Sequence, residues 1–230
     1  GEYISNEVLP YLNSLGIDPI KEGAKQISKV EVSTSKGNLI KGELPLGGFG
    51  MSRYFLDNLL LKKAQSNGVV VLKDSVDSVV FKNEVFTVQT KDSKLFQSKI
   101  TIGAFGKRSI LDLRMNRKFI KKKSPYLAVK IHVKGDFPEN VIALHNFKGG
   151  YCGVSKVENN SINLCYITEY KSFKKHKTIT DFQNRVMFKN KHLKKIFQES
   201  NSVFEKPLTI SQISFETKKP VENHIIMCGD

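Results

Sequence analysis

A short apolar stretch that ends in two glycines constrains the fold of this chain more than any other feature. Residues 99–109 read Lys-Ile-Thr-Ile-Gly-Ala-Phe-Gly-Lys-Arg-Ser, so that Gly103 and Gly106 flank Ala104 and Phe105 directly after an expected strand. Glycine lets the backbone approach another group closely, and in open α/β sheets ligands bind outside the carboxyl ends of the strands. The pattern therefore favours a ligand site at the end of a buried strand.

A second stretch of the chain ends in the same way. Residues 224–230 form an apolar run that closes on Gly229 and Asp230. Each glycine alone is also explained by an ordinary turn, because glycine is the default turn residue. Two glycine-flanked strand ends together favour one shared site at one edge of a sheet. The carboxylate of Asp230 can accept hydrogen bonds from ligand hydroxyls or cap a following helix, and both roles stay open.

Several motifs resemble the FAD-dependent oxidoreductases of the p-hydroxybenzoate hydroxylase superfamily, most closely the geranylgeranyl reductase branch. They are Arg53-x-x-Leu56-Asp57-x-x-Leu60, the stretch 102–109, the closing Cys228-Gly229-Asp230, and residues 1–5, which are similar to a segment near the flavin. The resemblance implies that the opening strand of the family, its G-x-G-x-x-G turn and its acidic ribose ligand precede Gly1. It also implies a helix after Asp230, so this chain resembles the middle of a flavoprotein.

The resemblance implies a mixed α/β fold class, in which part of a Rossmann-like FAD-binding domain is interleaved with an antiparallel substrate-binding sheet. The FAD-binding parts are expected at residues 1–25, at 51–117 with a β-meander, and at the return strand 221–230. The substrate-binding parts are expected as a hairpin at 26–50 and an antiparallel domain at 118–220.

The resemblance also implies which residues contact ligands. The implied FAD contacts are Arg53, Gly103, Ala104, Gly106, Gly229 and Asp230, the last at the ribityl chain. In the reductase branch a glycine-aromatic segment lines the substrate pocket, and residues 149–153 match it. Tyr151 and Cys152 are therefore candidates for contact with the substrate or the flavin ring, although both are equally explained as ordinary strand residues. No catalytic side chain is assigned, because the flavin itself carries the redox chemistry.

Arg53 has an electrostatic argument of its own. It stands in the first turn of a helix expected from about residue 52 to 66, where a cation opposes the helix dipole at a cost of a few tenths to about 1 kcal/mol. A nearby anion would offset that cost. The alternative is a solvated surface arginine, but Leu56, Asp57 and Leu60 stand at the spacing of the family, and the resemblance implies a phosphate or carbonyl group of FAD as the partner.

Hydrophobic periodicity predicts the remaining elements. The expected helices are 5–15 with an objection at Pro10, 180–188 and 193–197. The expected strands are a hairpin of 27–32 and 38–44, a meander of 75–81, 85–90 and 95–102, an antiparallel sheet of 126–133, 140–147, 151–157 and 161–168, and a last strand at 208–215. The continuous apolar run Gly68-Val-Val-Val-Leu72 predicts a short parallel strand that is covered on both faces.

The composition narrows the function classes. The three cysteines form no C-x-x-C pair and no histidine stands at ligand spacing, so we expect reduced thiols and no metal site. No apolar run reaches about 18 residues and the start is not a basic segment before an apolar one, so we expect neither a membrane span nor a signal peptide. The formal net charge of +15 suits anionic partners, although biased base composition also scatters lysines in this way.

The main functional hypothesis is an FAD-dependent oxidoreductase of the reductase or dehydrogenase type that acts on an apolar, isoprenoid or polyketide substrate. Phe105 stands where many flavin hydroxylases carry an aspartate, so NAD(P)H as the electron donor stays open. The alternatives are a flavin-dependent aromatic monooxygenase or halogenase and, from another class, a non-enzymatic basic module that binds nucleic acid or anionic lipid. No RNA-binding or DNA-binding motif is present, so we expect no specific nucleic acid partner. A cytoplasmic location is expected, and peripheral membrane contact through the basic surface stays open.

Overall fold

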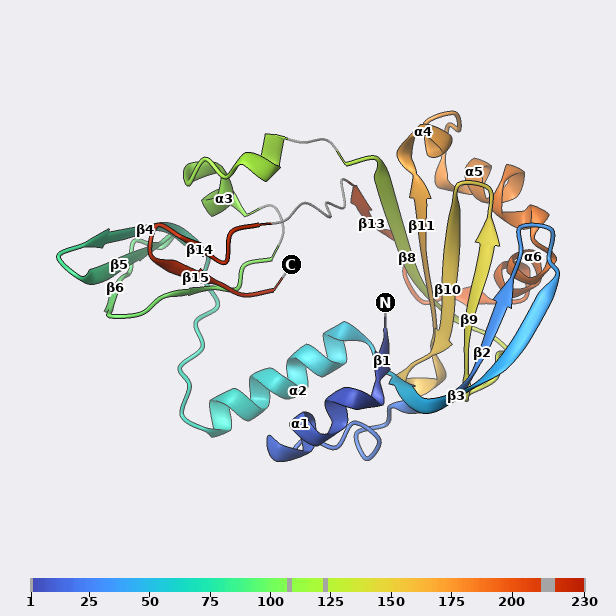
Figure 1. Ribbon diagram of the computed structural model, residues 1–230, viewed down its shortest axis with the longest axis horizontal. Coiled ribbons are helices and arrows are strands. Elements are labelled where there is room, and N and C mark those ends of the chain that lie inside the picture. The colour runs from blue at the N-terminus through green and yellow to red at the C-terminus, as the bar shows by residue number, and fades with distance from the viewer. Residues whose placement is uncertain (1, 107–108, 122–123, 212–217, 230) are drawn as a thin grey trace. The chain divides into compact units, whose positions relative to one another are not determined.

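The computed structural model describes residues 2–106, 109–121, 124–211 and 218–229 (Figure 1). The chain divides into two compact units. The larger unit comprises Gly1–Val69 and Pro125–Ile213, and the smaller unit comprises Val70–Ser124 and Ser214–Asp230. The predicted assignment of chain segments to FAD-binding and substrate-binding domains stays a prediction.

The larger unit is built on a nine-stranded sheet. Its order is β1-β3-β2-β9-β10-β11-β8-β12, and β13 also pairs with β8. The strands are β1 (Tyr3–Ser5), β2 (Lys25–Ser33), β3 (Leu39–Gly50), β8 (Tyr126–Lys134), β9 (Val141–Phe147), β10 (Gly150–Lys156), β11 (Ile162–Glu169), β12 (Asn201–Ser202) and β13 (Leu208–Ser211). Neighbours are antiparallel except β2 and β9, which run parallel. The predicted antiparallel sheet and the β2–β3 hairpin therefore lie in one sheet.

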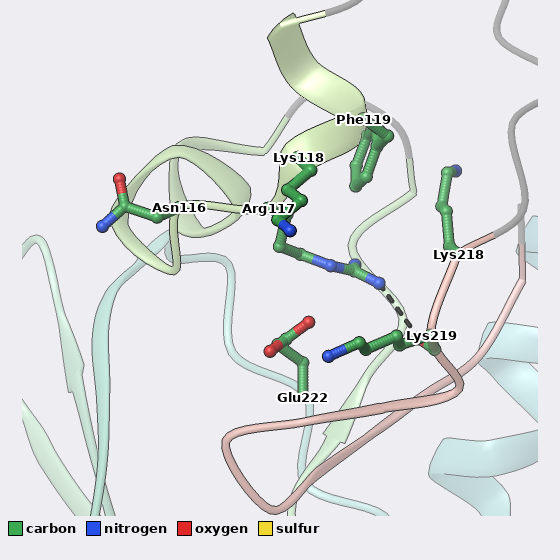
Figure 2. A pocket seen from close by; sticks show the side chains of 7 residues that line it. All are labelled: Asn116, Arg117, Lys118, Phe119, Lys218, Lys219 and Glu222. Carbon is green, nitrogen blue, oxygen red and sulfur yellow. Dashed lines mark hydrogen bonds between the residues drawn. The ribbon is translucent and has the colours of Figure 1, made fainter.

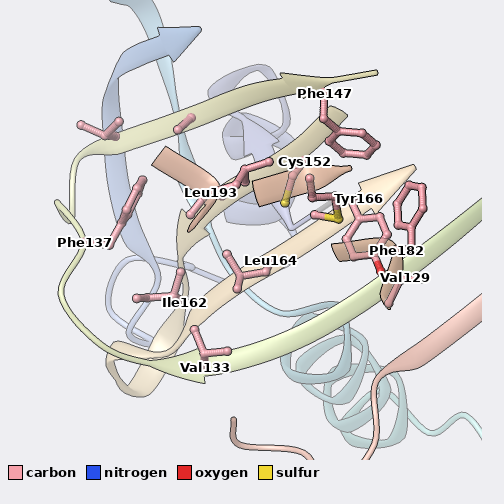
Figure 3. Packing of buried hydrophobic residues seen from close by; sticks show 14 of the residues in the cluster. Val129, Val133, Phe137, Phe147, Cys152, Ile162, Leu164, Tyr166, Phe182 and Leu193 are labelled. Atoms are coloured by element: carbon pink, nitrogen blue, oxygen red, sulfur yellow. The ribbon is translucent and has the colours of Figure 1, made fainter. Parts of the chain in front are cut away.

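Alternation of apolar and polar residues decides which face of this sheet is covered. In β9 every second residue is buried, and the same period of two continues in β8, β10 and β11. One face packs against α5 (Ile179–Arg185), η4 (Met187–Lys189) and α6 (Lys191–Gln198), which follow α4 (Tyr170–Phe173). Figure 3 shows Phe182 and Leu193 from these helices against Cys152, Leu164 and Tyr166 of the sheet.

The start of the chain and the helix after the hairpin share a second apolar cluster. It joins η1 (Asn6–Val8), α1 (Leu9–Ser14) and α2 (Arg53–Ser66) through Leu12, Met51 and Leu56. Pro10 stands at the start of α1, where proline is tolerated, so it begins the α-helix and does not kink it. Residues 47–50 continue β3, because Gly50 pairs with Tyr3 on one side and Lys25 on the other.

The smaller unit contains two three-stranded sheets. The meander of β4 (Val76–Lys82), β5 (Val85–Thr90) and β6 (Leu95–Ser98) was predicted. The second sheet has the order β14 (Val221–Glu222), β15 (Ile225–Met227) and β7 (Ile102–Gly103), so the predicted strand 95–102 divides between two sheets. Helix α3 (Ile110–Arg114) and η2 (Lys118–Lys121) follow β7, and η3 (Glu158–Asn160) belongs to the larger unit.

The predicted parallel strand at 68–72 is wrong. Residues 69–75 have no regular secondary structure, and the Val70 side chain is 83% exposed. The run pairs with no strand among the described residues, so it lacks the ladder of hydrogen bonds that a strand requires. The end of the predicted strand 208–215 lies outside the described residues. Within the described ranges, no helix combines the length and the apolar character that crossing a bilayer requires.

Candidate functional site

Two glycine-flanked strand ends meet in the smaller unit, as the sequence pattern indicates. Strands β7 and β15 run parallel, with Ile102 opposite Ile226 and Gly103 opposite Met227. Beyond the last pair, the Cys228 amide donates to the Gly103 carbonyl at 3.0 Å. A cavity of about 170 Å³ opens at this edge, lined by Gly103, Phe105, Gly106, Arg117, Lys218, Lys219, Pro220, Met227, Cys228 and Gly229. We call this place the glycine edge.

The three glycines are needed for different reasons. A Cβ on Gly103 would lie 2.8 Å from the Phe105 ring and 2.9 Å from the Met227 sulfur, so close packing requires its small size. Gly106 and Gly229 have φ angles of 67° and 88°, which disfavour any side chain, and nothing lies within 4 Å of their missing Cβ positions. Their backbone is therefore open to a ligand. Ala104, which stands between Gly103 and Gly106 in the chain, is exposed, and Asp230 lies outside the described residues.

Arg53 begins α2 in the larger unit, beside two carboxylates. The Arg53 amide donates to Glu2 Oε1 at 3.1 Å, and the Ser52 amide donates to Glu158 at 2.8 Å. Ser52 also caps the helix by accepting from the Phe55 amide. Glu2 and Glu158 of this chain therefore supply the negative charge that the N-terminus of a helix favours. The Arg53 side chain is exposed, and no ion pair to it is found within the described residues.

A buried charged cluster, which the sequence argument did not single out, lies beside this helix end. Glu2 is 2% exposed and accepts hydrogen bonds from Lys130 and His132, which lie two residues apart on the same face of β8. Burial alone would raise the pKa of the Glu2 carboxyl, but the bonds and charges of His132 and Lys130 outweigh it and lower that pKa. The similarity of residues 1–5 to a flavin-proximal segment was the only signal in the sequence for this cluster.

Lys130 and His132 lie on the sheet face opposite the covered core. Lys130 lies opposite Cys165, which lies opposite Gly153. His132 lies opposite Asn163, which lies opposite Ser155. The Asn163 side-chain oxygen and the Ser155 hydroxyl are buried without a hydrogen-bond partner in the described structure. This side of the sheet is covered at Asn163 and Ser155 but exposed at Tyr151, and we call it the open face.

Tyr151 belongs to the open face, whereas its neighbour Cys152 does not. Tyr151 is 45% exposed and lies opposite Ile167 and Asn146. Cys152 is fully buried in the core with Leu164, and burial raises the pKa of its thiol (Figure 3). Adjacent strand residues point to opposite faces, so Cys152 cannot reach a substrate that contacts Tyr151. The structure therefore places Cys152 away from the face on which Tyr151 is exposed, and contact of Tyr151 with a substrate or the flavin ring stays a prediction.

His145 is part of a buried structural network. Its Nδ1 lies 2.9 Å from Ser33 Oγ, and the Asn190 amide donates to the same hydroxyl at 2.7 Å. Burial, and then the nearby charge of His192, lower the pKa of His145 to about 4. This network joins β2, β9 and the start of α6, and it is closed to solvent.

Comparison with known proteins finds similarity in structure and none in sequence. No family model and no curated protein matches the chain. The flavin-dependent brominase Bmp2 superposes with a TM-score of 0.80 at 18% identity, over 100% of this chain and 62% of that chain. A flavoprotein/dehydrogenase from Cytophaga hutchinsonii gives a TM-score of 0.78 at 18% identity, over 100% and 61%. The myxobacterial chondrochloren halogenase CndH, an FAD-dependent halogenase, gives 0.78 at 14%, over 100% and 59%.

This chain has the fold of FAD-dependent flavoproteins. The predicted mixed α/β class is confirmed, and the chain spans about 62% of the length of the brominase it matches. The geranylgeranyl reductase branch is not confirmed by these structures. The described residues contain no group of side chains that could hold a metal ion.

The glycine edge fits the requirements of a flavin dinucleotide. The cofactor carries a pyrophosphate and a hydroxyl-rich ribityl chain, which bind to backbone amides and need close approach of the main chain. Gly106 and Gly229 supply open backbone, and Arg117, Lys218 and Lys219 supply positive charge on the same cavity wall.

Proposed function

We propose that this chain is part of an FAD-dependent oxidoreductase of the reductase or dehydrogenase type. The observation that carries the proposal is the glycine edge, where two parallel strand ends present Gly106 and Gly229 with open backbone. FAD, when bound, supplies the redox chemistry. In this proposal Gly103, Ala104, Gly106 and Gly229 let the cofactor approach the backbone closely. Asp230 accepts hydrogen bonds from its ribityl hydroxyls.

Arg53 is proposed as a further cofactor contact. Its helix end is already supplied with carboxylates by Glu2 and Glu158, so its exposed guanidinium is available for a phosphate or carbonyl group of FAD. The electron donor is left open between NAD(P)H and another reductant, because Phe105 replaces the aspartate that many flavin hydroxylases carry.

The open face suits an apolar or aromatic substrate. Around Tyr151, the partly exposed residues Leu144 and Ile167 provide apolar surface, and Gly153, which has no side chain, lies in register between Leu144 and Cys165. At one end of this face the cluster of Glu2, Lys130 and His132 supplies charge and hydrogen-bond donors. A mostly apolar surface with a few polar groups is typical of small-molecule sites. We propose an isoprenoid, polyketide or aromatic compound as the substrate class.

A halogenase or aromatic monooxygenase is the second candidate. The similarity in fold to the brominase Bmp2 and the halogenase CndH favours it, although fold alone does not decide the chemistry. Product analysis separates the candidates. A halogenase requires bromide or chloride, oxygen and a two-electron donor, and it replaces an aromatic hydrogen of a test substrate by halogen. A reductase adds two electrons and two protons from its donor to an alkene and needs no oxygen.

The class itself is tested by the colour and content of the full-length protein. We expect the purified protein to show flavin absorbance, and denaturation to release FAD identified by chromatography. A colourless protein that cannot be reconstituted with FAD contradicts the proposal. Binding to DNA that persists at physiological salt, without flavin, would instead favour the basic binding module, because purely electrostatic contacts weaken steeply with salt.

A further inference from the structure

A second cavity of the smaller unit concentrates positive charge. It has a volume of about 280 Å³ and is lined by Asn116, Arg117, Lys118, Phe119, Lys218, Lys219 and Glu222 (Figure 2). We call it the basic pocket. It shares Arg117, Lys218 and Lys219 with the cavity of the glycine edge, so the two cavities are neighbours.

Arg117 fixes the wall of the basic pocket. Its side chain is 6% exposed and forms a buried ion pair with Asp112, with Nη1 3.0 Å from Oδ1. Its Nη2 donates to the Lys219 carbonyl at 3.1 Å, which ties the segment after α3 to the segment before β14 (Figure 2). The basic residues of the pocket therefore come from two segments, and the buried Arg117 side chain joins these segments.

Phe119 holds two of the cations in place. The Arg117 guanidinium lies 5.1 Å from the centre of the ring, and the Lys218 ammonium lies 4.8 Å from it. Cation–π contacts restrict the positions of both groups. A wall that is ordered before a ligand arrives binds it at a lower entropic cost.

Basic side chains predominate in the described lining of the basic pocket. Arg117, Lys118, Lys218 and Lys219 line it together with one carboxylate, Glu222, and Asp112 pairs with Arg117 from behind. Lys118 and Lys219 are exposed to solvent. An anion in this space would reduce the repulsion among the cations.

We propose that the basic pocket binds a phosphate group of a small-molecule ligand. A phosphate offers several acceptor oxygens to the ammonium groups of Lys118 and Lys219. The volume of about 280 Å³ suits a phosphate or pyrophosphate group and lies below that of ordinary sites for whole drug-sized ligands. The group belongs either to FAD itself or to a separate phosphorylated ligand, and the phosphate site does not depend on the flavin proposal.

Binding of inorganic pyrophosphate to the full-length protein tests this site. At low ionic strength we expect Lys118→Ala and Lys219→Ala each to weaken binding about fivefold, as measured by calorimetry, because each removes one cation from the pocket. Glu222→Gln should strengthen binding, since it removes the one carboxylate of the lining. The control is Lys73→Ala, an exposed lysine of the same unit that does not line the pocket and should leave binding unchanged.

Protein loaded with FAD distinguishes the two sources of the phosphate. If FAD supplies it, FAD blocks pyrophosphate binding and Lys118→Ala lowers FAD affinity. If a separate ligand supplies it, pyrophosphate still binds to the FAD-loaded protein and FAD affinity is unchanged. Equal pyrophosphate binding by the wild type, Lys118→Ala and Lys219→Ala, all with unchanged thermal unfolding, overturns the proposal whether or not the protein binds FAD.

Discussion

The two units of the chain differ in how much of their apolar surface they bury. In the larger unit, Leu164 and Phe182 are fully buried between the sheet and its helices. In the smaller unit, Ile100 and Ile102 are 68% and 61% exposed although they lie in or beside the strand of the glycine edge. Both clusters of buried apolar side chains found among the described residues belong to the larger unit, which therefore packs the larger core.

The largest expected loss of stability comes from a substitution in the core of the larger unit. Phe182→Ala should lower the free energy of unfolding by about 3–5 kcal/mol, because it leaves a cavity among packed rings. Ile226→Ala in the smaller unit should cost less than about 1 kcal/mol, because that side chain is 47% exposed. Denaturant unfolding measures both. Similar losses for the two variants would show that the units do not differ as described.

The sequence predicts the larger unit well because its alternation is local. Strands β8 to β11 follow from the period of two, and the glycine edge follows from glycines placed directly after apolar runs. The same period could have shown that Tyr151 and Cys152 lie on opposite faces. The resemblance pointed to both residues, but only the side-chain direction decides which of them reaches a ligand.

Other features depend on contacts that periodicity does not encode. The cluster of Glu2, Lys130 and His132 joins residues far apart in the chain, and polar residues on alternate strand positions are usually solvated. The apolar run at 69–72 has the composition of a strand, but a strand needs a pairing neighbour as well as composition. Both outcomes were set by tertiary structure.

The pH dependence of stability should be larger for the buried His145 than for an exposed histidine. The folded-state pKa of about 4 lies below the ordinary 6.5, so the unfolded chain takes up a proton that the folded chain excludes. Stability is therefore fully present above pH 6.5 and falls by up to about 3 kcal/mol as the pH drops toward 4. His145→Gln should flatten this part of the stability curve. Parallel curves for the wild type and His145→Gln would contradict this reading.

A smaller loss in the free energy of unfolding should distinguish a buried ion pair from an exposed one. Lys130→Met leaves the buried Glu2 carboxylate with His132 and the Arg53 amide as partners, and we expect a loss of about 2 kcal/mol in the free energy of unfolding. The matched control is Lys41→Met, which removes an ion pair with Glu31 in which the lysine side chain is 70% exposed, and it should cost less than about 1 kcal/mol. Thermal and denaturant unfolding at neutral pH measure both variants. An equal cost would mean that the Glu2 cluster contributes no more than a surface pair.

FAD affinity tests the central claim, that the glycine edge of the smaller unit binds the flavin. Gly229 and Gly68 form a matched pair, because their φ angles are 88° and 85° and nothing lies within 4 Å of either missing Cβ. Alanine at either position should cost about 1 kcal/mol of stability through the strained backbone. In the full-length protein we expect Gly229→Ala to raise the dissociation constant of FAD at least about tenfold, which corresponds to roughly 1.4 kcal/mol, and Gly68→Ala to leave it unchanged. Equal FAD affinity in the two variants would contradict the account.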